Sequence, residues 1–213
     1  MLKCSTSLWS ADLTNLENEI KRIEPYSDRF HIDVADGQYV ETLLFFPDLV
    51  RAMRPHTKKL FEIHLLTLNP LEWIDVFSEA GADIIVFCFD TAHDPLQVIQ
   101  SIKDHGKQAG ISLSLQDDLD VLDPFWGDLD LVTIVCTDMG IKGAGMDQSI
   151  PEKIQRARDI VDKNGLECEI QADGGIRRHT VPLIQQSGAD SIVPGSLMFG
   201  EDPEEMTLWL ASL

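Results

Sequence analysis

Short apolar runs alternate with amphipathic segments eight times along the sequence. The apolar runs, which predict β-strands, cover residues 3–8, 29–34, 59–65, 83–88, 110–115, 130–136, 167–172 and 190–194. The amphipathic segments, which predict helices, cover residues 11–23, 47–55, 70–79, 95–106, 118–124, 151–163, 180–187 and 203–212. Strands that alternate with helices along a whole chain indicate a parallel β-sheet covered by helices.

Two similar segments in the two halves of the chain favour a closed barrel. Residues 80–86 read Ala-Gly-Ala-Asp-Ile-Ile-Val and residues 187–193 read Ser-Gly-Ala-Asp-Ser-Ile-Val, so a glycine precedes a strand in both. Gly188 follows Gly81 by 107 positions, which is half of the 213 residues and therefore four of eight equal units. We expect residues 1–213 to form a single (β/α)8 TIM-barrel domain, with an open doubly wound sheet as the alternative.

The overall charge limits the partners that the protein can have. The sequence holds 36 Asp and Glu residues against 17 Lys and Arg residues, so its net charge is −19. Such a surface repels nucleic acids and anionic membranes, and we expect neither as a partner. With no apolar run of 18 residues, no signal-peptide pattern at the start and no Cys-x-x-Cys pair, a cytoplasmic protein is expected.

Residues that can bind metal lie at the C-terminal ends of three predicted strands. His31 and Asp33 end the second strand, His64 ends the third and Asp173 ends the seventh. His31 and Asp33 are two residues apart, so they point to the same side of their strand. A TIM barrel carries its chemistry at these strand ends, and two imidazoles with two carboxylates suit Zn, Fe(II), Mn or Co. The alternative is that each residue is structural, as a buried histidine or a turn-forming aspartate often is.

Glycines follow the last two predicted strands. Gly174 and Gly175 come after the seventh strand, whereas Gly195 and Ser196 come after the eighth. Barrels often bind phosphate with backbone N–H groups of these two loops, and glycine lets the backbone approach the ligand closely. Backbone dipoles would also bind an anion without a basic surface. We therefore predict a phosphate site, although a plain turn is the alternative for each pair.

A third glycine-rich segment, residues 138–148, follows the sixth predicted strand. It contains Gly140, Gly143 and one positively charged residue, Lys142. Glycines around a cation are typical of a mobile loop that closes over a phosphate. We expect Gly140, Lys142 and Gly143 to contribute to substrate binding.

Five short motifs occur in a fixed order along the chain. Residues 5–12 resemble Ser-x-Ser-Ile-Leu-Ser-Ala-Asp, residues 31–37 resemble His-x-Asp-x-Met-Asp-Gly and residues 63–65 resemble the start of Val-His-Leu-Met. Residues 172–176 resemble Val-Asp-Gly-Gly-Val, and residues 193–200 resemble Ala-Gly-Ser-x-x-Phe-Gly. In this order, and at these barrel positions, they are similar to the motifs of the ribulose-phosphate 3-epimerase family over nearly the whole chain.

The resemblance implies an isomerase with the ribulose-phosphate-binding type of TIM barrel. It would invert C3 of D-ribulose 5-phosphate to give D-xylulose 5-phosphate through an enediolate, with Asp33 and Asp173 as acid and base on opposite faces. One divalent metal ion would be bound by His31, Asp33, His64 and Asp173. Ser7 would lie near the substrate, and Gly174, Gly175, Gly195 and Ser196 would bind its phosphate. Members of this family usually form homo-oligomers, so we expect one here.

The surroundings of these motifs depart from the family pattern. Ala35 and Leu66 stand where the family has methionine, Cys88 stands where it has histidine, and residues 138–148 replace a shorter loop. Since the predicted metal and acid–base residues are kept, the alternative is the same chemistry on another ketose phosphate. Candidates are allulose 6-phosphate, a tetrulose phosphate and an L-pentulose phosphate. A non-catalytic sugar-phosphate-binding protein is a further alternative.

Overall fold

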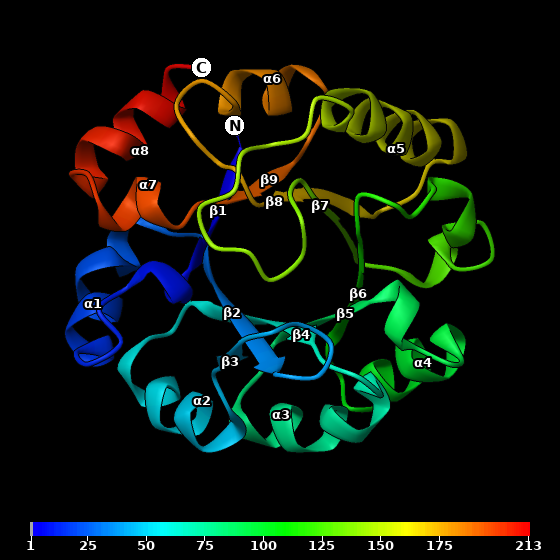
Figure 1. Cartoon of the computed structure of the whole chain (residues 1–213), viewed down its shortest axis with the longest axis horizontal. Helices are drawn as coiled ribbons and strands as arrows, with labels where there is room; N and C mark the ends of the chain where they lie inside the picture. The colour runs from blue at the N-terminus through cyan, green and yellow to red at the C-terminus, as the bar shows by residue number, and fades with distance from the viewer. Residues whose placement is uncertain (1) are drawn as a thin grey trace.

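The computed structural model describes residues 2–213, and in this part of the chain eight parallel strands close into a barrel (Figure 1). The barrel strands are β1 (Lys3–Ser7), β2 (Arg29–Asp36), β4 (Leu60–Leu66), β5 (Ile84–Cys88), β6 (Gln108–Leu113), β7 (Leu131–Val135), β8 (Glu169–Asp173) and β9 (Ser191–Val193). β1 pairs in parallel with both β2 and β9, and this closes the sheet. The predicted TIM barrel is confirmed, and the open-sheet alternative is wrong.

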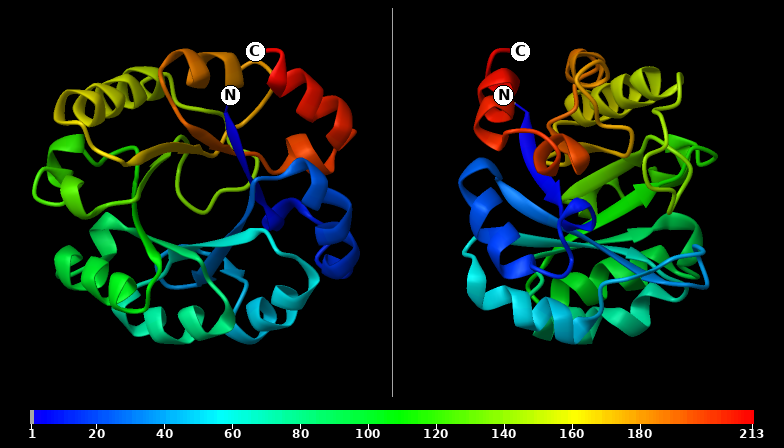
Figure 2. Two further views of the ribbon diagram at one scale, coloured as in Figure 1. Left: turned by 180° about the vertical axis from the view of Figure 1, so that it is seen from behind. Right: turned by 60° about the vertical axis from the view of Figure 1, so that its left-hand side comes forward.

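Helices surround the barrel, and the view from behind shows the same ring (Figure 2). They are α1 (Leu16–Ile23), α2 (Pro47–Met53), α3 (Ile74–Ala80), α4 (Pro95–Asp104), α5 (Ile150–Asn164), α6 (Val181–Gln186), α7 (Ser196–Phe199) and α8 (Pro203–Ala211). Short 3-10 helices lie between them: η1 (Leu8–Ser10), η2 (Glu24–Tyr26), η3 (Arg54–His56), η4 (Pro70–Trp73), η5 (Phe89–Thr91), η6 (Leu119–Leu122) and η7 (Trp126–Asp128). Among residues 2–213, no helix combines the length and the apolar character that a membrane span requires.

Several local features differ from the sequence-based prediction, among them the following. The segment 118–124 forms only the 3-10 helix η6, because the Asp118 side chain accepts a hydrogen bond from the Asp120 N–H and Pro124 follows at once. Helix α1 begins five residues later than predicted, since Asp12 accepts hydrogen bonds from Thr14 and holds a turn there. A short strand, β3 (Leu43–Leu44), pairs antiparallel with the end of β2 and was not predicted.

Side chains alternate between the two sides of each strand, and this alternation determines what the barrel holds. On β2, Phe30 and Ile32 are fully buried in the main apolar core. Burial of one such side chain contributes roughly 1.5–3 kcal/mol. The alternate residues, Arg29, His31 and Asp33, point into the barrel instead. The barrel interior of this protein is therefore partly polar.

The loop between β7 and α5 crosses the opening of the barrel in Figure 1. It comprises residues 136–149 and includes the glycine-rich segment. The same view shows that it lies over the interior rather than along the outer ring of helices. This position makes the loop one wall of the space at the C-terminal ends of the strands.

Candidate active site

A pocket of about 250 Å³ opens at the C-terminal ends of the barrel strands. It brings together eleven of the twelve candidate residues: Ser7, Asp33, His64, Gly140, Lys142, Gly143, Asp173, Gly174, Gly175, Gly195 and Ser196. The twelfth, His31, does not line the pocket because it is fully buried, but its ring contacts the Asp33 carboxylate. Candidates chosen on separate strands and loops thus lie around one space.

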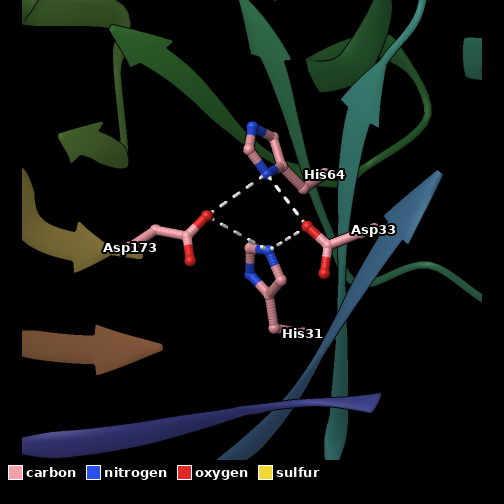
Figure 3. Close-up of side chains that lie close together, drawn as sticks. All are labelled: His31, Asp33, His64 and Asp173. Atoms are coloured by element: carbon pink, nitrogen blue, oxygen red, sulfur yellow. Dashed lines mark hydrogen bonds and ion pairs between the residues drawn. The ribbon is translucent and has the colours of Figure 1, made fainter. Parts of the chain in front are cut away.

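Four of these side chains converge on one point (Figure 3). One potential ligand atom from each of His31, Asp33, His64 and Asp173 lies within 4.8 Å of the other three. The Nε2 atom of His31 is 3.0 Å from Asp33 Oδ1 and 3.8 Å from Asp173 Oδ2. The Nδ1 atom of His64 is 3.5 Å and 3.6 Å from the same two oxygens.

The strand register explains this convergence. Asp33 on β2 lies directly opposite His64 on β4, so the two side chains share the inner face of the barrel. Asp173 is the last residue of β8 and reaches the same point from the other side of the barrel. Residues far apart in sequence meet here because parallel strands end at the same level.

The chemistry of this cluster fits a divalent cation. His64 Nδ1 is buried and makes no hydrogen bond within the described residues, although it faces both carboxylates. A buried nitrogen without a partner is unfavourable, and a cation bound to its lone pair would satisfy it. Two imidazole nitrogens and two carboxylate oxygens are a donor set that Zn, Fe(II), Mn and Co accept.

The buried charges shift one another's pKa values. Burial alone would lower the pKa of His31, but the nearby carboxylates, Asp33 first, raise it well above its ordinary value. Burial would likewise lower the pKa of His64, yet the neighbouring Asp33 carboxylate helps to raise it to about 9. The pKa of Asp33 is lowered, since the charge of His31 outweighs the effect of burial, whereas burial raises the pKa of Asp173. Metal binding to such a cluster would release protons.

The loops after β8 and β9 border the other side of the pocket. Gly175 has a φ of +64°, and a Cβ atom there would lie 2.6 Å from the backbone nitrogen of Met146. The position therefore requires glycine for both its conformation and its close approach to the loop after β7. The backbone N–H groups of Gly175 and Ser196 make no hydrogen bond among residues 2–213, so they are free to bind an anion.

A hydrogen bond from Lys142 holds the loop after β7 across the pocket opening. The Lys142 ammonium donates a hydrogen bond to the backbone oxygen of Trp9 at 2.8 Å and lies 5.9 Å from the centre of its ring. Gly140 packs against Val40, whereas a Cβ at Gly143 would have no neighbour within 4 Å. Lys142 thus lies at the pocket, but its charge already has a partner.

Two residues of this region were not predicted from the sequence. One is Arg177, which adds a second positively charged side chain to the pocket wall beside Lys142. The other is Glu62, which is fully buried and has its Oε1 atom 2.6 Å from His31 Nδ1. Burial would raise the pKa of Glu62, but the charge of Arg29 outweighs it and lowers that pKa to about 2. The signal for Glu62 was its position two residues before His64, which places both on the same face of β4.

The departures from the family pattern lie next to the cluster. Ala35, Leu66 and Cys88 pack together with Val40 in a small apolar group. Leu66 also lines the pocket, and the Cys88 sulfur lies 4.0 Å from His64 Nε2. These substitutions therefore change one wall of the candidate site and leave the four converging side chains in place.

Known proteins resemble this chain along almost its whole length. The model of the Ribulose-phosphate 3 epimerase family matches residues 3–199. A ribulose-phosphate 3-epimerase of Bacillus subtilis (strain 168) is 33% identical over 210 residues, which cover 98% of this chain and 97% of that protein. One of Chlamydia pneumoniae is 35% identical over 199 residues, covering 92% and 87% respectively.

A solved structure of 3-hexulose-6-phosphate synthase resembles this chain in fold. The match covers 99% of both chains with a TM-score of 0.66, and the two sequences are 17% identical. At that identity the likeness concerns the barrel architecture alone.

Proposed function

The chain belongs to the ribulose-phosphate 3-epimerase family and is an isomerase, and on this premise we propose that it interconverts D-ribulose 5-phosphate and D-xylulose 5-phosphate. The reaction inverts the configuration of C3, the carbon next to the ketone. The observation that carries the proposal is the pair Asp33 and Asp173, which reach one pocket from β2 and β8.

Inversion at this carbon needs one proton-transferring group on each face of the substrate. A proton leaves from one face, a planar enediolate forms, and a proton returns to the other face. We assign one of these transfers to Asp33 and the other to Asp173. The Ser7 hydroxyl donates a hydrogen bond to Asp33 Oδ2 at 3.0 Å, and this bond would hold the carboxylate in one orientation.

We also propose that His31, Asp33, His64 and Asp173 bind one divalent metal ion of the group Zn, Fe(II), Mn and Co. When bound, the ion would supply positive charge beside the substrate oxygens and so stabilise the negative charge of the enediolate. The unpartnered Nδ1 atom of His64 supports this assignment.

The phosphate of the substrate would bind to the loops after β8 and β9. We assign the contacts to the backbone of Gly174, Gly175, Gly195 and Ser196, with the loop that contains Gly140, Lys142 and Gly143 above them. Ser7 would lie between the two parts of the site, since a Cβ on Gly195 would be 4.0 Å from Ser7 Cβ. A fixed phosphate would keep the sugar in place while C3 is planar.

A second candidate is the same reaction on another ketose phosphate. The apolar group of Ala35, Leu66 and Cys88 favours it, because smaller walls beside the reacting carbon can admit a different sugar. Allulose 6-phosphate, a tetrulose phosphate and an L-pentulose phosphate are the candidates. The homo-oligomer and the cytoplasmic location expected from the sequence stay predictions.

Proton NMR in D₂O tests the proposed reaction. Purified protein loaded with a divalent metal is incubated with D-ribulose 5-phosphate, beside a sample treated with a chelator. We expect deuterium at C3 and the signals of D-xylulose 5-phosphate in the first sample only. Absence of both with metal present would contradict the pentulose assignment, and the other ketose phosphates would then be tested in the same way.

A further inference from the structure

Glu62 lies beneath the candidate metal site and contacts one of its ligands. We propose that Glu62 is a positioning residue that fixes the tautomer and the ring orientation of His31, so that His31 Nε2 presents its lone pair to the metal ion. The inference rests on the metal site of the proposed function and adds a residue to it. It depends on contacts inside the barrel that the sequence motifs do not include.

The two ring nitrogens of His31 face in opposite directions. Nε2 faces Asp33 and Asp173, whereas Nδ1 is 2.6 Å from Glu62 Oε1. An ionised carboxylate can only accept a hydrogen bond, so Nδ1 must carry the proton. In a neutral imidazole Nε2 is then the nitrogen with the free lone pair.

Glu62 is itself held in one position. Its Oε2 atom accepts hydrogen bonds from the Ser5 hydroxyl and the Gln171 amide, each at 3.1 Å, and forms an ion pair with Arg29 Nε. All of these side chains are buried. Three partners on Oε2 leave Oε1 for His31, and the carboxylate cannot rotate without breaking them.

These partners form a layer directly below the candidate site. Each lies two positions before a site residue on its own strand: Ser5 before Ser7, Arg29 before His31, Glu62 before His64, and Gln171 before Asp173. Since side chains two apart share a face, both layers point into the barrel. The lower layer therefore supports the upper one at four strands.

The charge of Glu62 is balanced inside the protein. Arg29 bridges Glu62 to Glu169, with Nη2 2.5 Å from Glu169 Oε1, and Lys3 lies 2.7 Å from Oε2 of the same residue. Two carboxylates thus alternate with two cations. A buried carboxylate without such partners would be strongly unfavourable.

The other histidine of the site has a neutral partner. His64 Nε2 lies 2.9 Å from the Ser112 hydroxyl, which donates its own hydrogen bond to the Cys88 sulfur at 3.3 Å. The Ser112 oxygen is then left to accept a hydrogen bond from His64 Nε2, which leaves the lone pair of His64 on Nδ1. Glu62 differs from Ser112 in being charged, and a charge-assisted hydrogen bond holds its histidine more strongly.

Zinc binding and histidine NMR of Glu62→Gln test the proposal. A glutamine keeps the size of the side chain, but its amide can donate to Nδ1 and so permit the wrong tautomer. We expect Zn²⁺ affinity, measured by calorimetry, to fall about 10- to 100-fold. In zinc-loaded protein labelled with ¹⁵N-histidine, the proton on His31 Nδ1 should be visible in the wild type and shifted or lost in the variant.

Ser191→Ala is the matched control. Ser191 is equally buried and its hydroxyl accepts a hydrogen bond from Arg29, but no hydrogen bond joins it to His31. Its Zn²⁺ affinity should stay within about twofold of the wild type. If Glu62→Gln fails to fold because Arg29 loses one of its two carboxylate partners, the double variant Arg29→Met with Glu62→Gln removes both charges and takes its place.

Three results would overturn the proposal. If Glu62→Gln changes neither the Zn²⁺ affinity nor the His31 spectrum, Glu62 does not position His31, although the metal site itself is unaffected. If the zinc-loaded wild type carries its proton on His31 Nε2, the proposed tautomer is wrong. Failure of the wild type to bind Zn²⁺, Mn²⁺ or Co²⁺ would instead remove the metal part of the proposed function, and this inference with it.

Discussion

Asp33 and Asp173 approach the same two imidazole nitrogens from strands that are not neighbours. Asp33 Oδ1 is 3.0 Å from His31 Nε2 and 3.5 Å from His64 Nδ1, and Asp173 Oδ2 is 3.8 Å and 3.6 Å from the same atoms. Strands β1 and β9 separate β2 from β8 in the barrel. The two carboxylates therefore enter the pocket from different directions, as a reaction on two faces of one carbon requires.

Replacing either carboxylate should abolish turnover and leave the fold intact. We expect Asp33→Asn and Asp173→Asn each to lower kcat by about 10² to 10⁴, because an amide cannot transfer the proton. A coupled assay measures the rate, and circular dichroism measures the fold. Asp159→Asn, at an exposed position on α5, is the control and should keep the wild-type rate. Near-normal activity of either site variant would disprove the two-base assignment.

Removing the metal ion should stop the reaction and lower the melting temperature. An ion that binds only the folded state stabilises it by about 2.7 kcal/mol when its concentration is 100 times Kd. We expect EDTA to abolish activity and a divalent ion to restore both activity and Tm. In His64→Ala the ion should no longer raise Tm. Full activity after exhaustive chelation would rule out metal dependence.

The substitution Gly175→Ala should impair substrate binding. A Cβ atom at this position would meet the Met146 backbone at 2.6 Å, and the φ of +64° disfavours any other residue. We expect KM to rise about tenfold or more, which corresponds to about 1.4 kcal/mol. Gly145→Ala is the control, because a Cβ there has no neighbour within 4 Å. Equal KM values for the two variants would show that the loop after β8 does not hold the substrate.

The barrel could be predicted because its signal is repeated along the chain. The outward face of each strand packs against helices and is apolar, whereas the inward face can carry polar side chains. Strand β2 is therefore recognisable from Phe30 and Ile32, which alternate with His31 and Asp33. The same period of two places the candidate ligands inside. Local hydrogen bonds were harder to predict, and the turn held by Asp12 shortened α1 for that reason.

The layer beneath the site could not be predicted in the same way. Glu62 carries no motif of its own, and its role depends on contacts with Arg29 and Gln171 from other strands. A sequence places each of these on the inner face, but it does not say which charges pair. Lys142 presents a similar case, since its bond to Trp9 joins two loops that are far apart in sequence.

The substitution Lys142→Ala should act mainly on KM. The ammonium lies at the pocket and ties the loop after β7 to Trp9, so its loss removes a positive charge and the fastening of the loop. We expect KM to rise about three- to tenfold, equivalent to roughly 0.7–1.4 kcal/mol, with a smaller change in kcat. Lys58→Ala, at an exposed position far from the pocket lining, should leave both constants unchanged. Unchanged kinetics in Lys142→Ala would mean that this lysine belongs to the solvated surface.

Glu169 should make the stability of the barrel dependent on pH. Burial would raise the pKa of Glu169, but the hydrogen bond and charge of Arg29, with the help of Lys3, lower it below its ordinary value. A carboxylate with a lowered pKa stabilises the fold above its unfolded pKa of about 4.3. That contribution is lost as the pH falls through the lower pKa of the folded state.

We therefore expect Glu169→Gln to lower the free energy of unfolding by about 1–3 kcal/mol at pH 7, because Arg29 loses one of two carboxylate partners but keeps Glu62. Urea unfolding at several pH values measures the difference between variant and wild type, which should shrink below about pH 4.3. Glu167→Gln changes an exposed residue two positions away and should stay within about 0.5 kcal/mol at every pH. A difference that does not vary with pH would show that the Glu169 charge adds nothing, and the pairing of Arg29 with Glu62 alone would then account for the stability of the layer.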